Sequence, residues 1–206
     1  CRFEDNRCVS APTGLTSAGL LVQQSGNASV AADTAPISVA VERTHFVGNE
    51  LLLSEPFDPA SEDLVNGGAA AAFWLPQRVS LFRVVDCSFV RNAAAGHGGA
   101  LSVRHFIAAG GGGGGDCASA SASLVVARAR FVNNSCGGAG SSLLAQSHQS
   151  VVRVSDSQFV GGAAGGLGGC VFILARATFD RTVFDRCRSG ASAQMRACTL
   201  QSQLAS

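Results

Sequence analysis

The sequence predicts an all-β fold, a single-stranded parallel β-helix of about five or six coils. Three observations predict it: a repeat anchored by phenylalanine, apolar residues at every second position before each anchor, and small glycine-rich turns after it. Apolar residues spaced by two are typical of strands that bury alternate side chains, and glycine allows tight turns between such strands. Repeats of this kind stack so that their apolar faces form one continuous core.

Six phenylalanines anchor the copies of the repeat. They are Phe3, Phe46, Phe89, Phe131, Phe159 and Phe184. Successive anchors lie 43, 43, 42, 28 and 25 residues apart, which fits coils of roughly 23 to 28 residues with insertions in the longer copies. Three positions after the first four anchors stand Asn6, Asn49, Asn92 and Asn134, whereas Gly162 and Cys187 occupy that position in the last two copies. A stack of asparagines is therefore expected to end at the fourth copy.

Each anchor lies between an apolar strand pattern and a small-residue turn. Before each of the last five anchors, the residues five and seven positions earlier are apolar, as Val84 and Phe82 are before Phe89. Inward residues spaced by two, with one interval of three, predict a strand, a bend and a second short strand. The turns after the anchors carry the glycine pairs Gly67 and Gly68, Gly98 and Gly99, Gly137 and Gly138, and Gly168 and Gly169.

The whole chain, residues 1–206, is interpreted as one β-helix segment of a larger protein, and its start at Cys1 fits a segment of a longer chain. Residues 50–66 and 107–123 interrupt the second and third copies and are predicted to be surface loops. An open solenoid end exposes unpaired strand edges. Other domains of the same parent chain are therefore the expected partners.

A second regularity concerns charge. The residue three positions before the anchor runs Arg43, Asp86, Arg128, Asp156, Arg181 in successive copies. Coils stacked about 4.8 Å apart would place these residues in a ladder of alternating charge, in which opposite charges attract. Coincidence over five positions is the alternative interpretation. If the ladder forms, Asp86 and Asp156 have a structural role and are not catalytic acids.

Composition argues against two classes of partner. The formal net charge is only +1 and charged residues are 14% of the chain, so the basic field that nucleic acid binding requires is missing. Apolar runs fall short of the roughly 18 to 20 residues of a membrane span, so no membrane insertion by this segment is expected. A hydrophobic content of 47% is enough for a continuous core.

The segment Cys87–Leu101, CSFVRNAAAGHGGAL, resembles the repeat of chlamydial polymorphic outer-membrane proteins, whose hallmark is Phe-x-x-Asn followed by Gly-Gly-Ala and an aliphatic residue. The resemblance covers most of residues 1–190, is strongest at Phe89 to Leu101 and is weakest at Phe184, which lacks both the Asn and the glycine pair. It implies a right-handed, pectin-lyase-like solenoid, a surface location and an adhesive or structural role. It implies no catalytic residues.

A carbohydrate-acting enzyme, either a lyase or a hydrolase, is the alternative on the same solenoid. Such an enzyme needs paired carboxylates, or a carboxylate with a basic group, on neighbouring coils. Asp180, Arg181, Asp185 and Arg186 are the strongest candidates, and solvated charges on the outside of the last coil are the simpler interpretation. No catalytic residues are therefore predicted.

Neither a metal site nor a cofactor site is predicted. The histidines His45, His97, His105 and His148 share no ligand spacing with one another or with cysteine, and no C-x-x-C motif occurs. The segment Gly111 to Asp116 matches the G-G-x-G-x-D calcium pattern only formally, because that motif binds calcium in tandem copies. We interpret it as a glycine-rich loop.

Eight cysteines favour an oxidising compartment without defining a disulfide pattern. Cys1 and Cys87 share one small inward position of the repeat, and Cys8 and Cys136 share another, so these four are expected to be free thiols in the core. The better disulfide candidates are Cys117, Cys187 and Cys198.

Two N-x-Ser sequons, at Asn27 and Asn133, are candidate N-glycosylation sites and also favour an extracellular location. The resulting hypothesis is a non-catalytic cell-surface or extracellular module, structural or adhesive, with extracellular proteins or glycans as candidate ligands. The alternatives are the carbohydrate-acting enzyme and a rigid intracellular scaffold. Reduced cysteines and an unglycosylated Asn27 and Asn133 would favour the scaffold.

Overall fold

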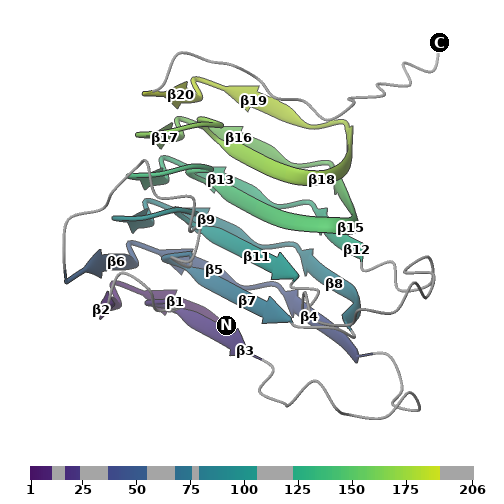
Figure 1. Ribbon diagram of the computed structural model, residues 1–206, viewed down its shortest axis with the longest axis horizontal. Coiled ribbons are helices and arrows are strands. Elements are labelled where there is room, and N and C mark those ends of the chain that lie inside the picture. The colour runs from purple at the N-terminus through teal and green to yellow at the C-terminus, as the bar shows by residue number, and fades with distance from the viewer. Residues whose placement is uncertain (11–16, 24–36, 55–67, 76–78, 106–122, 191–206) are drawn as a thin grey trace, which may run out of the picture.

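The computed structural model describes residues 1–10, 17–23, 37–54, 68–75, 79–105 and 123–190. Every regular element in these residues is a β-strand, and the strands form three parallel sheets. The all-β class predicted from the sequence is confirmed. The chain visits the three sheets in the same order in each layer, so that strands far apart in sequence lie side by side (Figure 1).

Sheet A contains the anchor phenylalanines. Its strands, in spatial order, are β1 (Arg2–Glu4), β5 (His45–Val47), β9 (Ser88–Val90), β13 (Arg130–Val132), β16 (Gln158–Val160) and β19 (Val183–Asp185). Each anchor pairs in register with the anchor of the next strand. Their rings stack with centroids 4.6–5.0 Å apart and planes within 10° of parallel. Strand spacing thus sets the ring spacing.

Sheet B follows directly in each layer. Its strands are β2 (Arg7–Ser10), β6 (Glu50–Leu53), β10 (Ala93–Ala94), β14 (Ser135–Cys136), β17 (Ala163–Ala164) and β20 (Arg188–Ser189). Their inward side chains form a second, smaller apolar cluster that includes Leu51, Ala94, Cys136 and Ala164. Ala94, Cys136 and Ala164 are small, and Leu51 is the bulky member of this cluster.

The predicted loop 50–66 is wrong at its start, because Glu50–Leu53 forms β6. Leu51 is fully buried in register with Cys8 and Ala94, so the strand continues past the asparagine position. Residue 123, the end of the other predicted loop, belongs to a strand of the third sheet. Residues 55–67 and 106–122 lie outside the described residues.

Sheet C is the widest sheet. Its strands are β3 (Leu20–Gln23), β4 (Ile37–Glu42), β7 (Ala71–Leu75), β8 (Val79–Val85), β11 (Leu101–His105), β12 (Ser123–Ala127), β15 (Leu143–Ser155) and β18 (Val171–Asp180). The first half of the sheet contains β3, β7 and β11, and the second half contains β4, β8 and β12. The long strands β15 and β18 extend through both halves. Alternate residues such as Val126, Val152 and Val154 point into the core and are buried.

Two corners repeat in every layer, and each is turned by a residue with positive φ. Between sheets C and A these residues are Arg43, Asp86, Arg128, Asp156 and Arg181; between A and B they are Asp5, Gly48, Arg91, Asn133, Gly161 and Arg186. A single left-handed residue reverses the side-chain alternation and bends the strand. The next residue then points inward, which is how the asparagines enter the core.

Register also corrects the alignment of the glycine pairs. Leu101 pairs with Leu143, so Gly98 corresponds to Gly140, and Gly140 in turn to Gly168. All three have φ between 64° and 70°. Gly137 and Gly138 therefore do not stack on Gly98 and Gly99, because the fourth copy places its left-handed glycine later in the turn.

Candidate functional site

A ladder of buried asparagines lies at the corner between sheets A and B. The side-chain Nδ2 of Asn6 donates to Oδ1 of Asn49 at 2.8 Å, that of Asn49 to Asn92 at 2.9 Å, and that of Asn92 to Asn134 at 3.0 Å. Each of the three inner asparagines also donates to the carbonyl of the anchor phenylalanine one layer before. Asn49, Asn92 and Asn134 have no exposed surface. The amides therefore satisfy one another and serve the fold.

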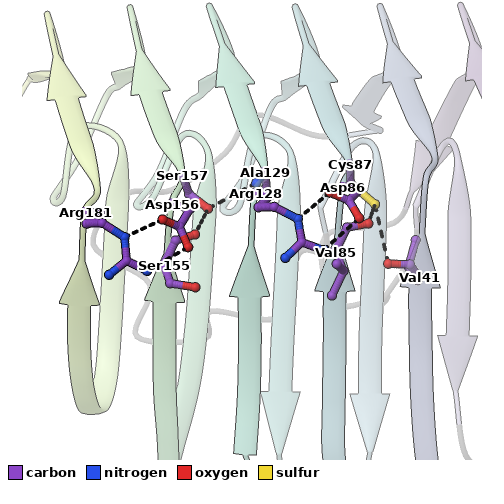
Figure 2. A network of polar contacts seen from close by, with 10 residues as sticks. All are labelled: Val41, Val85, Asp86, Cys87, Arg128, Ala129, Ser155, Asp156, Ser157 and Arg181. Carbon is purple, nitrogen blue, oxygen red and sulfur yellow. Dashed lines mark hydrogen bonds and ion pairs between the residues drawn. The ribbon is translucent and has the colours of Figure 1, made fainter.

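The corner between sheets C and A carries the charged residues that the sequence placed in a ladder (Figure 2). Arg128 binds Asp86 through two hydrogen bonds of 2.6 and 2.8 Å, and Arg181 binds Asp156 through two of 2.6 and 3.0 Å. These bonds lower the pKa of both carboxyl groups below the ordinary value. Arg43 adds a weaker Coulombic attraction to Asp86. Both aspartates thus stay ionised and engaged.

The inner side of this corner carries a row of small polar side chains. Thr44, Cys87, Ser157 and Thr182 each donate to the carbonyl of the residue two positions earlier. Cys87 also donates to the carbonyl of Val41, one layer before, at 3.4 Å (Figure 2). Burial raises the pKa of the Cys87 thiol, so it stays protonated and unreactive at neutral pH.

The charge ladder makes a prediction about salt. Arg128 lies between Asp86 and Asp156 in the ladder. Replacing it with Asp would place three carboxylates in consecutive layers. We expect a lower melting temperature than wild type and, unlike wild type, a gain of stability as salt is added, because salt screens repulsion between exposed charges. Thermal unfolding at several NaCl concentrations measures this. The neutral variant Arg128→Gln removes the attractions without adding repulsion, so it should lose less stability and gain none as salt is added; identical behaviour of the two variants would contradict a coupled ladder.

The residues considered for catalysis lie on the last layers and pair among themselves. Arg181 contacts Asp180 at 2.6 Å in addition to Asp156, and Arg186 contacts Asp185 at 3.0 Å. All four candidate side chains are exposed. Asp180 ends β18 of sheet C, and Asp185 ends β19 of sheet A. The arginine that follows each of them in the sequence is its ion-pair partner. The arrangement is that of solvated ion pairs.

One disulfide bond joins the last two layers, between Cys170 and Cys187 with Cα atoms 5.2 Å apart. Cys187 occupies the asparagine position of the sixth layer, and Gly162 occupies it in the fifth. A Cβ added to Gly162 would lie 2.5 Å from Sγ of Cys170. The missing side chain at Gly162 therefore makes room for the bond, which links the layers where the asparagine ladder has ended.

Cys187 was among the predicted disulfide residues, but its partner Cys170 was not. Cys117 and Cys198, the other two, lie outside the described residues. Of the four cysteines expected as core thiols, Cys87 and Cys136 are buried, and burial raises the pKa of Cys136 to about 12. The other two, on the first layer, are less covered: Cys1 is exposed and Cys8 is intermediate.

Reduction of this bond should loosen the last layer first. Val183 and Phe184 are 52% and 47% exposed, so few apolar contacts hold β19 in place. Cys170 and Cys187 are 17 residues apart in the sequence. In the chain-entropy model, a disulfide that closes a loop of this length contributes about 3 kcal/mol to the free energy of unfolding. We expect hydrogen exchange of residues 183–190 to rise strongly on reduction, or in Cys170→Ser/Cys187→Ser, while that of β13 is unchanged. Equal exchange in both states would contradict the role of the bond.

Two polar side chains are buried at the start of sheet C in the third layer: His97, in the turn before β11, and Arg104, on β11. His97 is 4% exposed and Arg104 is 3% exposed, and the side chains of Ser102, Ser141 and Ser142 are buried as well. Nδ1 of His97 accepts a hydrogen bond from the Ala139 backbone N–H at 2.9 Å. Burial, helped by the charge of Arg104, lowers the pKa of His97 to about 4. The imidazole is therefore neutral in the folded protein at neutral pH.

This histidine should make the fold sensitive to acid. The unfolded chain binds a proton at His97 near pH 6.5, whereas the folded chain does so only near pH 4. Its contribution is therefore complete above pH 6.5 and is lost as pH falls toward 4, by about 2 kcal/mol between pH 7 and pH 5. Denaturant unfolding should show a shallower pH dependence in His97→Gln. His45→Gln, at an exposed position, is the control and should behave as wild type.

The remaining predicted positions give no metal or ligand cluster. Within the described residues, no group of three or more His, Cys, Asp and Glu side chains could hold a metal ion. His45 is exposed and contacts Ser88 at 2.7 Å. Of the two sequon asparagines, Asn133 is exposed at the corner between sheets A and B, and Asn27 lies outside the described residues. The Gly111 to Asp116 segment is likewise outside them.

None of the described residues forms a helix long and apolar enough to cross a membrane. Comparisons with known proteins extend none of these observations. No protein-family model, no curated protein and no solved structure matches the chain.

Proposed function

We propose that the chain is a segment of a right-handed, single-stranded parallel β-helix and serves as a non-catalytic structural or adhesion module of the cell surface or extracellular space. The repeated order of the three sheets and the continuous phenylalanine and asparagine stacks support the architecture. A stack of this kind presents a rigid, elongated surface whose length grows with the number of layers.

The Cys170–Cys187 bond carries the proposal of location. Disulfides persist in oxidising compartments and are rare where glutathione and thioredoxin keep thiols reduced. Exposed Asn133 within a sequon is in keeping with this location. An intracellular scaffold would require the bond to be absent in the cell, and this separates the two proposals.

The engagement of the acidic side chains supports a structural rather than a catalytic role. Asp86 and Asp156 accept two hydrogen bonds each from arginines, which holds their pKa values low, whereas a general acid needs a raised pKa. Exposed apolar residues on the last layer, Val183 and Phe184, suit contact with further protein. Other domains of a longer parent chain are the partners that we propose for this layer.

Antibody labelling of intact, unpermeabilised cells tests the proposal, together with glycosidase treatment of the labelled protein. External labelling, a mass decrease after deglycosylation and resistance of Cys187 to alkylation without reductant are expected. Labelling only after permeabilisation, with Cys187 fully alkylated, would favour the intracellular scaffold instead.

A further inference from the structure

The second half of sheet C carries arginines on the side that faces away from the core. Arg83 on β8 and Arg153 on β15 both pair in register with Val125 of β12, which lies between them. Arg176 on β18 pairs with Val151, two residues before Arg153. Neighbouring strands are about 4.8 Å apart, so Arg83 and Arg153 are separated by about 10 Å along the stack. We call Arg83, Arg153 and Arg176 the arginine face.

These three side chains are available to a partner. Each is exposed, and none forms an ion pair within the described part of the chain. The two flanking residues of Arg83, Phe82 and Val84, point into the core, which fixes the arginine on the outside. The outward position of these arginines therefore follows from the alternation of side chains along the strands.

The balance of charge on this face is strongly positive for a chain whose net charge is +1. At the adjoining corner, Asp86 and Asp156 are each held by an arginine, so neither neutralises the face. Glu42, at the end of β4, is the exposed carboxylate left without an ion pair among the described residues of β4, β8, β12, β15 and β18. The described part of this face therefore carries a net positive charge.

We propose that the arginine face binds a linear anionic polysaccharide that lies along the stack, across the strands. Guanidinium groups bind sulfate and carboxylate groups through paired hydrogen bonds, and they remain charged at any physiological pH. A polymer with closely spaced charges can contact arginines that lie one and two layers apart on one sheet. The proposal rests on the extracellular location proposed above, where such polymers occur.

Single-stranded nucleic acid is the competing polyanion, and the face lacks what that ligand uses. Proteins that bind single strands add aromatic platforms on which bases stack. The outward residues beside these arginines are Val125, Ala127, Ser155 and Thr178, none of them aromatic. The residues at hand offer charge and a flat surface, which suits a polysaccharide better.

Binding of the full chain to heparin, to polygalacturonate and to neutral dextran tests the proposal by calorimetry at 0.15 M salt. Wild type is expected to bind one or both anionic polymers and not dextran. The triple variant Arg83→Gln/Arg153→Gln/Arg176→Gln should weaken that binding by about tenfold, on the scale of three exposed charge contacts. Its affinity should also fall less steeply as salt is added, because fewer counterions are released.

The matched control is Arg91→Gln/Arg186→Gln/Arg188→Gln, which removes the same charge from the corner between sheets A and B and from sheet B. It should change the affinity by less than about twofold. Circular dichroism and an intact Cys170–Cys187 bond verify that both variants are folded. Equal losses in the two variants, no binding by wild type, or equally tight binding of a single-stranded oligonucleotide would each overturn the proposal. Surface labelling that succeeds while polysaccharide binding fails would leave the proposed function standing.

Discussion

Phe131→Ala should lower the free energy of unfolding by about 3 to 5 kcal/mol, the usual cost of truncating a fully buried phenylalanine. Phe131 has no exposed surface, and its ring lies between those of Phe89 and Phe159 at 4.6 Å on each side. Its removal loses the transfer free energy of the ring, two stacking contacts and the packing around the cavity. Urea-induced unfolding followed by circular dichroism measures the loss.

Phe184→Ala is the matched control, since it removes the same ring from the last layer. Phe184 is 47% exposed and stacks on Phe159 alone, with an edge contact to Phe179. We expect a loss of about 1 to 2 kcal/mol, because roughly half of the ring already faces water. Similar losses for the two variants would mean that the stack does not bear the stability of the central layers.

Asn92→Ala should destabilise the protein by about 3 to 5 kcal/mol, although it removes only a small polar group. Asn92 Oδ1 accepts from both the backbone N–H and the side-chain Nδ2 of Asn49, and its own Nδ2 donates to Phe46 and Asn134. Alanine removes one hydrogen bond from each of these four buried groups, at about 1 kcal/mol for each, while Asn49 Nδ2 keeps its bond to Phe3 and Asn134 Oδ1 keeps the one from the Asn92 backbone N–H. The same unfolding experiment applies.

Asn6→Ala tests whether the cost comes from burial. Asn6 lies on the first layer and donates to Asn49 from its backbone and its side chain, with only partial burial. Water can replace the lost side-chain bond there, so we expect a cost of about 1 kcal/mol. If Asn92→Ala costs no more than this control, water must enter the ladder and satisfy the remaining amides.

The sequence predicted those features that depend on repetition. The spacing of the phenylalanines leads to the register in which Phe46 lies between Phe3 and Phe89, because parallel pairing brings equivalent positions of successive copies together. It also leads to the asparagine stack and its end at Asn134, since a chemically identical neighbour in every layer satisfies both the donor and the acceptor of an amide. Local pattern was sufficient for these features.

Features that depend on a single layer could not be read in this way. The partner of Cys187 depends on Gly162, whose significance as space for Cys170 becomes apparent only when the layers are stacked. Arg104 alternates with the core residue Val103 and so lies on the outer side of β11, where a polar side chain would normally face water, yet it is buried, as is His97 in the turn before this strand. No residue pattern or motif in the sequence predicts that these two side chains are buried.

The direction of the backbone hydrogen bonds has a mechanical consequence. In a parallel sheet these bonds are evenly spaced and slanted, and they join neighbouring strands, so in this protein they run from one layer to the next. Tension that pulls the two ends of the stack apart therefore loads one interface between layers, and the weakest interface fails first. The Cys170–Cys187 bond crosses the interface beneath the exposed last layer. It places a covalent link where a pulled stack would otherwise begin to peel.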